Sequence, residues 1–209
     1  MIKNEEAGSV ILDLIKTIQD NKDFLSEVDG KIGDGDHGIN MNKGFTMCKD
    51  KLDGKEFGLS EGLQILGETL QEDIGGSMGP LYGVFFEELS TSTADVIDAQ
   101  VFSEMLDNAI QAIQEIGGAK RGDKTLLDTL FSAQDAYKMA LKDGKGFKEA
   151  LEQLKNGAKE GWQSTEGMIA KIGRASRLGE RSRGVLDAGA TSSYLILTSI
   201  ANSLQDLIK

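Results

Sequence analysis

Cysteine, proline and histidine each occur only once in this chain of 209 residues. With Cys48 alone, no internal disulfide can form, which excludes a disulfide-stabilised extracellular scaffold. No proline- or serine-rich linker divides the chain, so we expect one domain over residues 1–209. No segment approaches the about 20 consecutive apolar residues that span a membrane, and the charged N-terminal residues do not resemble a signal peptide. We therefore expect a cytoplasmic protein without a membrane partner.

Positive charge is also scarce. The chain contains 23 lysines and arginines against 34 aspartates and glutamates, which gives a formal net charge of −11. Such a surface repels nucleic acids and anionic lipids, so neither is an expected partner. A site for an anionic nucleotide must therefore contain its own local positive charge.

No convincing alternation of apolar and polar residues, the pattern of a half-buried strand, occurs in the chain, and no βαβ order appears. Apolar residues instead recur at helical spacing, as at Val10, Ile11, Leu14, Ile15 and Ile18. Similar stripes lie at 63–70, at 109–116 before two glycines, from 126, at about 147–169 and at 190–208. The sequence therefore predicts an all-α antiparallel bundle of about seven or eight helices.

Glycine is abundant, with 26 residues, and it is concentrated in the segments 30–44, 75–83, 117–122 and 173–189. These segments lie between predicted helices. In an antiparallel bundle, alternate connections emerge at the same end. We therefore expect one site that all four loops build at one rim of the bundle.

The first loop is rich in carboxylates, and glycines separate Asp29, Asp34 and Asp36. If residues 34–36 are extended, the last two carboxylates point to the same side. Mg²⁺ prefers oxygen ligands and often lies between protein carboxylates and phosphates. A calcium EF-hand loop is excluded, because Ile39 occupies the position that requires glycine. A solvated acidic turn remains the alternative to a magnesium site.

The second loop, residues 75–83, has the features of a phosphate-binding helix start. Two glycines and Ser77 precede Pro80, which suits a first helical turn because its missing N–H would be unpaired there. Free backbone N–H groups and the positive end of the helix dipole attract phosphate oxygens. An ordinary capped helix start is the alternative.

The third loop nearly matches a P-loop. However, Asp123 lies between Gly122 and Lys124, and a helix rather than a strand precedes the loop. We therefore reject a P-loop and expect Asp123 to be the N-cap of the helix that carries Leu126. Asp128, within that helix, is expected to serve the fold.

The fourth loop contains most of the local positive charge. Between positions 171 and 183 it has one acid and five basic residues, Lys171, Arg174, Arg177, Arg181 and Arg183. Arginine suits phosphate because its planar fork donates two bonds at once. A long loop without regular structure favours a function. Overall acidity and few aromatic residues argue against nucleic acid, and a solvated loop remains the alternative.

The single histidine, His37, follows Asp36 directly. Because Mg²⁺ prefers oxygen, we expect His37 to be a hydrogen-bonding member of the loop rather than a metal ligand or a general base. No Ser–His–Asp or Cys–His arrangement is visible in the sequence, so no catalytic residue is assigned.

Together, the four loops resemble the nucleotide-binding L subunits of bacterial dihydroxyacetone kinases, the DhaL family. The matching runs are Gly33-Asp34-Gly35-Asp36-His37-Gly38 with Asn40 and Asn42, Gly75-Gly76-Ser77-Met78-Gly79-Pro80-Leu81, Gly122-Asp123-Lys124-Thr125, Gly173-Arg174-Ala175-Ser176, Gly179-Glu180-Arg181-Ser182 and Gly189-Ala190-Thr191-Ser192. They occur in order over nearly the whole chain, and their combination is more specific than any single run.

The resemblance implies an eight-helix, barrel-like bundle that binds Mg–ADP or Mg–ATP at one rim. It implies that Asp29, Asp34 and Asp36 hold two Mg²⁺ ions that bridge the nucleotide phosphates. The implied phosphate contacts are His37, Gly38, Ile39, Asn40, Ser77 and Met78. The implied remainder of the nucleotide pocket is Gly117, Leu126, Arg174, Asp187, Ala188 and Gly189.

The same resemblance implies a phosphoryl-transfer enzyme with two protein partners. A separate K subunit would bind the short hydroxyketone, and a phosphotransferase-system phosphoprotein, the M subunit, would recharge bound ADP to ATP. Two alternatives stay open. The chain could instead exchange free ATP in a dihydroxyacetone or erythrulose kinase, or it could be a non-catalytic, nucleotide-dependent module that binds a transcription regulator through residues 171–183.

Overall fold

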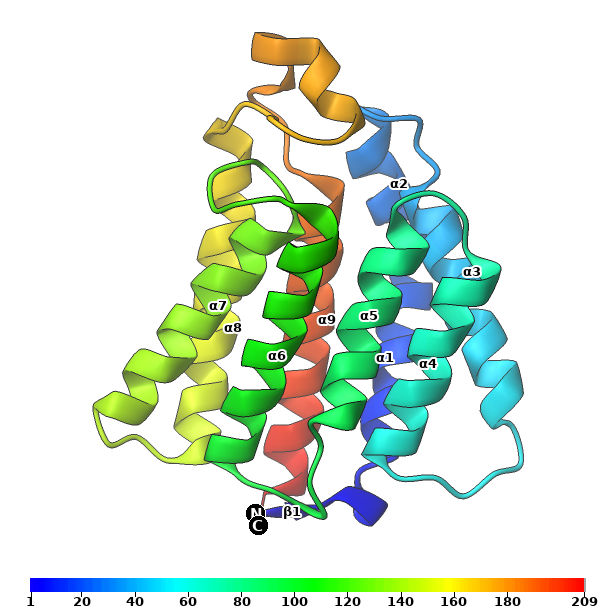
Figure 1. Cartoon of the computed structure of the whole chain (residues 1–209), viewed down its shortest axis with the longest axis vertical. Helices are drawn as coiled ribbons and strands as arrows, with labels where there is room; N and C mark the ends of the chain where they lie inside the picture. Colours follow the sequence, from blue (N-terminus) through cyan, green and yellow to red (C-terminus); the bar gives the residue numbers. More distant parts are fainter. Residues whose placement is uncertain (209) are drawn as a thin grey trace.

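The computed structural model describes residues 1–208, which form nine α-helices and two short strands (Figure 1). The helices are α1 (Ser9–Asp20), α2 (Lys22–Gly30), α3 (His37–Leu52), α4 (Leu59–Asp73), α5 (Met78–Thr91), α6 (Ala99–Gly117), α7 (Leu126–Lys142), α8 (Phe147–Ser164) and α9 (Ala188–Leu207). Three 3-10 helices are η1 (Asn4–Glu6), η2 (Thr165–Gly167) and η3 (Arg174–Ser182). The strands β1 (Ile2–Lys3) and β2 (Val96–Ile97) pair antiparallel. The all-α prediction is confirmed, with this two-residue pairing as a small exception.

The helices form a closed ring. α1 and α2 are two parts of one bent rod, because Asn21 departs from helical geometry with φ −105° while its amide still bonds to carbonyls of the preceding turn. The nine described helices therefore form eight helical rods. Each rod packs against the next one in the chain, and α9 packs against α1 and so closes the ring. The expected barrel-like bundle of about eight helices is therefore found.

Apolar side chains fill the interior of the ring. The stripe predicted for the first helix is buried as a whole: Val10, Ile11, Leu14, Ile15 and Ile18 are at most 2% exposed. Removal of such side chains from water is the main term that stabilises a fold of this kind. Cys48 is buried in the same core. None of the described helices is both long enough and apolar enough to cross a lipid bilayer.

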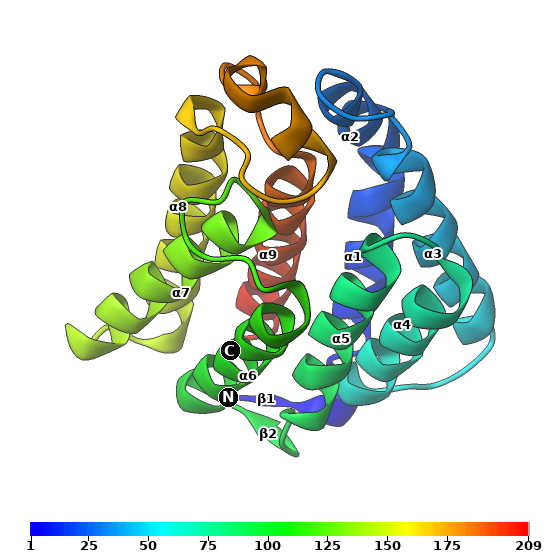
Figure 2. The same ribbon diagram turned by 45° about the horizontal axis from the view of Figure 1, so that its top comes forward.

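Four interhelical connections meet at one end of the ring. They are residues 31–36, 74–77, 118–125 and 165–187, which precede α3, α5, α7 and α9. Figures 1 and 2 show these connections together at the top of the molecule, with η3 as the outermost part, while β1 and β2 lie at the opposite end. The expectation that the glycine-bearing loops gather at one rim is confirmed.

The start of α7 differs from the predicted one. The N-cap is Thr125 rather than Asp123, since Thr125 Oγ1 accepts a hydrogen bond from Leu127 N at 3.2 Å. Asp128 Oδ2 accepts from Thr125 N at 2.8 Å and completes a capping box. Asp123 instead accepts from Lys120 N at 2.7 Å and closes the preceding turn. The expectation that Asp128 serves the fold is confirmed.

The connection from α8 to α9 also differs from the expectation. The helix predicted to reach about residue 169 ends at Ser164, and η2 continues it for one short turn. The basic stretch expected to lack regular structure contains η3, which begins after Gly173 at φ +75°. Gly173 precedes η3 and Gly179 lies at a kink within it, and both have positive φ, a conformation that glycine adopts readily. α6 ends at the two glycines that follow its apolar stripe, and Gly118 has a left-handed conformation with φ +63°.

α7 and α8 pack closely because α8 presents glycines to α7. A Cβ atom added to Gly157 would lie 2.5 Å from Ser132 O, and one added to Gly161 would lie 2.6 Å from Asp128 O. Residues four apart lie on the same face of a helix, so these two glycines form one contact strip. This packing holds the start of α7 beside the end of α8, and so brings the third loop to the fourth.

We expect Gly161→Ala to lower the melting temperature by several degrees, because the added methyl group meets α7 backbone that can yield only by moving a helix. Gly167→Ala is the matched control, since a Cβ there meets nothing within 4 Å. Thermal unfolding followed by circular dichroism compares the two variants. Equal melting temperatures would contradict the close approach of α7 and α8.

Candidate functional site

The rim carries a cavity of about 610 Å³. All four connections contribute to its wall, together with the ends of the helices that they join. The lining contains polar residues, several of them from residues 29–40, and apolar residues, most of them from other segments. The polar residues include Asp29, Asp34, Asp36, His37, Asn40, Ser77, Arg174 and Asp187. The apolar residues include Pro80, Leu81, Ile113, Ile116, Leu126 and Ile172.

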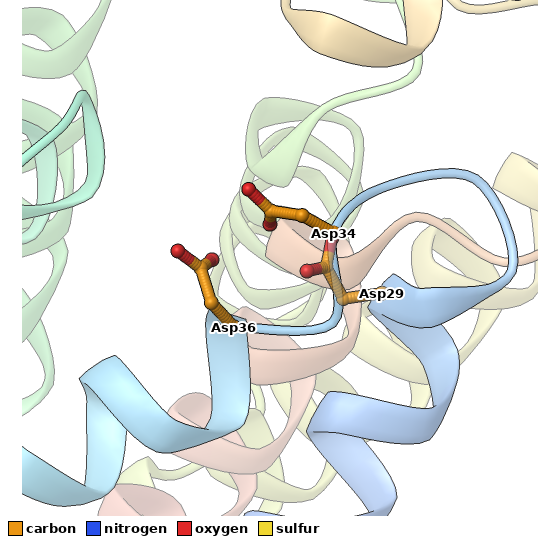
Figure 3. A group of neighbouring side chains, drawn as sticks. All are labelled: Asp29, Asp34 and Asp36. Atoms are coloured by element: carbon orange, nitrogen blue, oxygen red, sulfur yellow. The ribbon is translucent and has the colours of Figure 1, made fainter.

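Three carboxylates converge at this cavity. One oxygen from each of Asp29, Asp34 and Asp36 lies within 4.8 Å of the other two, and Figure 3 shows the side chains projecting to the same side of the loop. The loop can pass close to Asp29 because residue 33 is glycine: a Cβ there would lie 2.3 Å from Asp29 Oδ1. Three hard oxygen donors that repel one another fit a divalent cation such as Mg²⁺. One of the three carboxylates, that of Asp34, forms an ion pair with Arg174.

Helix N-termini add positive potential to the same cavity. α3, α5, α7 and α9 all begin at this rim, so the positive ends of four helix dipoles face it. Side chains cap α7 and α9, through Thr125 and Asp187. The N-caps of α3 and α5, Asp36 and Ser77, make no such side-chain bond. At α3 the first backbone N–H, His37 N, donates to Asp29 Oδ2 at 3.3 Å. The N–H groups that follow it in the first turn of α3, and those at the start of α5, are the ones that no N-cap side chain occupies.

His37, in the first turn of α3, belongs to a hydrogen-bonded network. Its Nε2 lies 2.9 Å from Ser192 Oγ, which in turn lies 2.5 Å from the hydroxyl of Tyr82. Burial lowers the pKa of His37 to about 4, against an opposing effect of the Asp29 charge, so the ring is neutral near pH 7. Ser192 has no solvent exposure and cannot reach a bound reactant. The network therefore holds His37 in place, in agreement with the expected hydrogen-bonding role.

The carboxyl group of Asp187, the N-cap of α9, lies in surroundings that disfavour its charged form. Its Oδ2 accepts a hydrogen bond from Ala190 N at 2.7 Å. Burial raises the pKa of Asp187 to about 6, and the charges of Asp128 and Asp29 act in the same direction, while Lys124 opposes them. At neutral pH the carboxylate is thus ionised at the expense of stability.

The apolar part of the cavity lining is unusually exposed. Ile116 is 53% exposed and Ile172 38% exposed, although both side chains are large and apolar. Leu81 and Ile113 continue this surface into the cavity. A cavity that combines apolar residues with a carboxylate cluster suits a ligand with an apolar part and a charged part.

Most of the residues named from sequence meet at this cavity, including those from the third and fourth loops, Gly117, Leu126, Arg174, Ala188 and Gly189. Met78 also lines it. Gly38 and Ile39 do not. Gly38 is buried where α3 meets α2, since a Cβ there would lie 2.0 Å from Lys22 O. Ile39 is 54% exposed and lies outside the cavity wall.

Sequence reasoning missed several residues of the site. Ile113 was assigned to an ordinary helical stripe. Tyr82 was included in the second loop without a role, and no local pattern links it to Ser192, which is 110 positions away. Lys124 was considered in a rejected P-loop and in one of the runs of the family resemblance, without an assigned role. No signal in the sequence indicated that its side chain is buried.

The fold and the site together define a class of protein: an all-α ring with a rim pocket lined by carboxylates and helix N-termini. Residues 31–202 match the DAK2 domain, and the chain belongs to this family.

Similar proteins carry related names. The chain is 39% identical over 183 residues to the PTS-dependent dihydroxyacetone kinase ADP-binding subunit DhaL of Lactococcus lactis, covering 87% of this chain and 88% of that protein. It is 34% identical to the PEP-dependent dihydroxyacetone kinase ADP-binding subunit DhaL of Escherichia coli, covering 86% and 87%. The crystal structure of the dihydroxyacetone kinase of C. freundii matches with a TM-score of 0.71 at 24% identity, over 94% of this chain and 34% of that chain. This structural likeness supports the fold alone.

We expect Asp187→Asn to raise the melting temperature near pH 7 by a few degrees, because asparagine still caps α9 and carries no buried charge. Since folding raises the pKa of this carboxyl from 3.8 to about 6, its contribution to stability is complete below pH 4 and is lost as the pH rises through 6. The difference between variant and wild type should therefore grow from pH 4 to pH 7. A difference independent of pH, measured without nucleotide or metal, would contradict this assignment.

Proposed function

We propose that this chain is the nucleotide-binding, phosphoryl-transferring subunit of a cytoplasmic dihydroxyacetone kinase. Mg-bound ADP stays at the rim as a cofactor, and a phosphotransferase-system phosphoprotein, the M subunit, converts it to ATP. The terminal phosphoryl group then passes to the hydroxyl oxygen of a short hydroxyketone on a separate K subunit, and ADP remains on this chain.

The observation that carries the proposal is the coincidence of two features in one cavity. Three carboxylates lie within 4.8 Å of one another, and α3 and α5 begin at the same cavity with N-cap residues, Asp36 and Ser77, whose side chains make no cap hydrogen bond. Carboxylates alone would repel a phosphate, and helix N-termini alone would attract any anion. Together they favour a phosphate that arrives with its own cation.

Asp29, Asp34 and Asp36 would hold the metal, for which we propose two Mg²⁺ ions. When bound, the metal supplies neutralisation of phosphate charge and orientation of the transferred group. The chain would contribute phosphate contacts near His37, Asn40, Ser77 and Met78, from the main-chain N–H groups of the first turns of α3 and α5 other than His37 N, which donates to Asp29. The apolar wall with Leu126 would bind the base.

Arg174 supplies a side-chain cation to this site of an acidic protein; the other lysine or arginine of the cavity wall, Lys124, already donates to three carbonyl groups. Arg174 lines the cavity and pairs with Asp34 in the structure. Its guanidinium would exchange this partner for phosphate oxygens when nucleotide and metal bind. In phosphoryl transfer, such positioning and charge neutralisation are the main protein contributions.

The names of the relatives support the phosphoprotein-dependent form. The DhaL subunits named as PTS- or PEP-dependent are 34–39% identical to this chain. The L-erythrulose kinase of Pectobacterium atrosepticum is 32% identical over 182 residues. We therefore favour a held ADP cofactor and dihydroxyacetone over exchange of free ATP and erythrulose.

Purification without added nucleotide tests the held cofactor. We expect the denatured protein to release about one ADP per chain, identified by chromatography, together with Mg²⁺ measured by elemental analysis, because a recharged cofactor must not leave between turnovers. An empty chain that binds and releases Mg–ATP freely would favour the ATP-exchanging form. An empty chain that binds neither nucleotide would refute the proposed function.

We expect the double substitution Asp34→Ala and Asp36→Ala to abolish detectable Mg–ADP binding by calorimetry while the fold stays intact. The nucleotide-free variant should be at least as stable as the wild type, since two like charges leave the cluster. Asp50→Ala with Asp53→Ala is the matched control, because these exposed carboxylates lie at the other end of α3. Unchanged nucleotide affinity in the first variant would refute the metal assignment.

A further inference from the structure

The rim segment, defined here as residues 168–187 between η2 and α9, forms the outermost part of the site and contains η3 (Figure 2). It carries Arg174 and Ile172 to the cavity. Its two ends lie side by side: Ala170 N donates to Ser182 Oγ at 2.9 Å, and Gly184 N donates to Glu166 O at 2.8 Å. The segment is therefore a closed loop whose orientation depends on how its base is held.

Lys124 lies under that base. Its ammonium donates to Ser182 O and Val185 O at 2.5 Å each and to Met168 O at 3.3 Å. These carbonyl groups come from both ends of the rim segment. The lysine is 1% exposed. Burial lowers the pKa of Lys124, and the charges of Asp187 and Glu166 oppose this effect. The three carbonyl groups satisfy the donors of the buried ammonium.

The backbone at this position is unusual as well. Lys124 has φ +63° and is the single non-glycine residue with positive φ among residues 1–208. A lysine has no intrinsic preference for this conformation, which persists only where the surrounding structure imposes it. The neighbouring Asp123 adds to the same attachment, since Asp123 O accepts from Lys171 N at 3.1 Å.

The opposite side of the rim segment reaches across the cavity to the first loop, where Arg174 pairs with Asp34. The two ends of the rim segment are thus bound to the ammonium of Lys124, and the side chain of Arg174 extends from the segment to the carboxylate cluster. A phosphate-binding role for Lys124 does not fit, because its Nζ already donates to three carbonyl oxygens beneath the segment.

We propose that Lys124 is a positioning residue: its buried ammonium joins both ends of the rim segment, so that the segment holds Arg174 over the carboxylate cluster and retains bound nucleotide. This inference rests on the proposed nucleotide-binding function. It assigns to the third loop a role as the anchor of the fourth, with no contact to phosphate.

The first test needs no ligand. In Lys124→Met, amide hydrogen exchange of Ala170, Lys171 and Gly184 should become about tenfold faster, because three charge-assisted hydrogen bonds are lost, while α1 and α3 exchange as before. Lys120→Met is the matched control, an exposed lysine of the same loop. If Lys124→Met does not fold, Lys124→Gly replaces it, since glycine accepts the left-handed backbone. Unchanged exchange in the folded variant would overturn the proposal.

The second test uses protein from which any retained ADP has been removed. It measures release of a fluorescent ADP analogue, N-methylanthraniloyl-ADP with Mg²⁺, after a chase with excess ADP. We expect about tenfold faster release from Lys124→Met and from Arg174→Met. The double variant should release no faster than the quicker single variant, because both act through one element. Binding of Mn²⁺ without nucleotide should not weaken in Lys124→Met, since the carboxylates lie on other elements.

Three results would overturn the role of Lys124: wild-type release rates in its variants, additive effects with Arg174→Met, or weakened Mn²⁺ binding, which would indicate general disruption. Failure of the wild type and of Lys120→Met to bind the analogue would instead refute the proposed function, and the exchange experiment would still decide whether Lys124 holds the rim segment.

Discussion

The convergence of four helix N-termini at one rim is the constraint on which the rest of this structure depends. A ring of alternating helices that closes on itself must place every second connection at the same end. Here α3, α5, α7 and α9 all begin at that end. In a chain of net charge −11, these dipoles supply positive potential that side chains largely do not. The site therefore follows from the ring closure as much as from its individual residues.

Opposed charges are concentrated at the same rim. The carboxylates of Asp29, Asp34 and Asp36 repel one another, and Asp187 is ionised against its surroundings. Arg174 and Lys124 offset this charge from the rim segment and from beneath it. Proteins commonly depart from the most stable arrangement at functional sites. The buried apolar core and the close contact of α7 with α8 provide the stability that this arrangement lacks.

Much of the architecture could be predicted because the evidence for it is local. The spacing of Val10 to Ile18 predicted a buried helical face. The carboxylates of Asp34 and Asp36 do lie together, but residues 34–36 are not extended as the prediction for them assumed, because Gly35 has φ +77° and Asp36 is in the right-handed helical region. The start of α7 was predicted wrongly, since Asp123 and Thr125 are both good N-cap residues. Which of them caps the helix depends on the left-handed Lys124 between them, and that conformation depends on carbonyl groups 44 to 61 positions away.

Some patterns involve only residues that are close in sequence: the helical spacing of apolar residues, the glycines between helices and the grouped carboxylates. The sequence alone was therefore sufficient to indicate an all-α ring and a loop suited to binding a metal ion. Contacts between distant segments required the folded molecule: His37 with Ser192, 155 positions apart, Lys124 under the rim segment, and the burial of Gly38 away from the cavity. Their physical reason is packing. Which polar groups become buried, and which partners then satisfy them, is settled only when helices that are far apart in sequence come into contact.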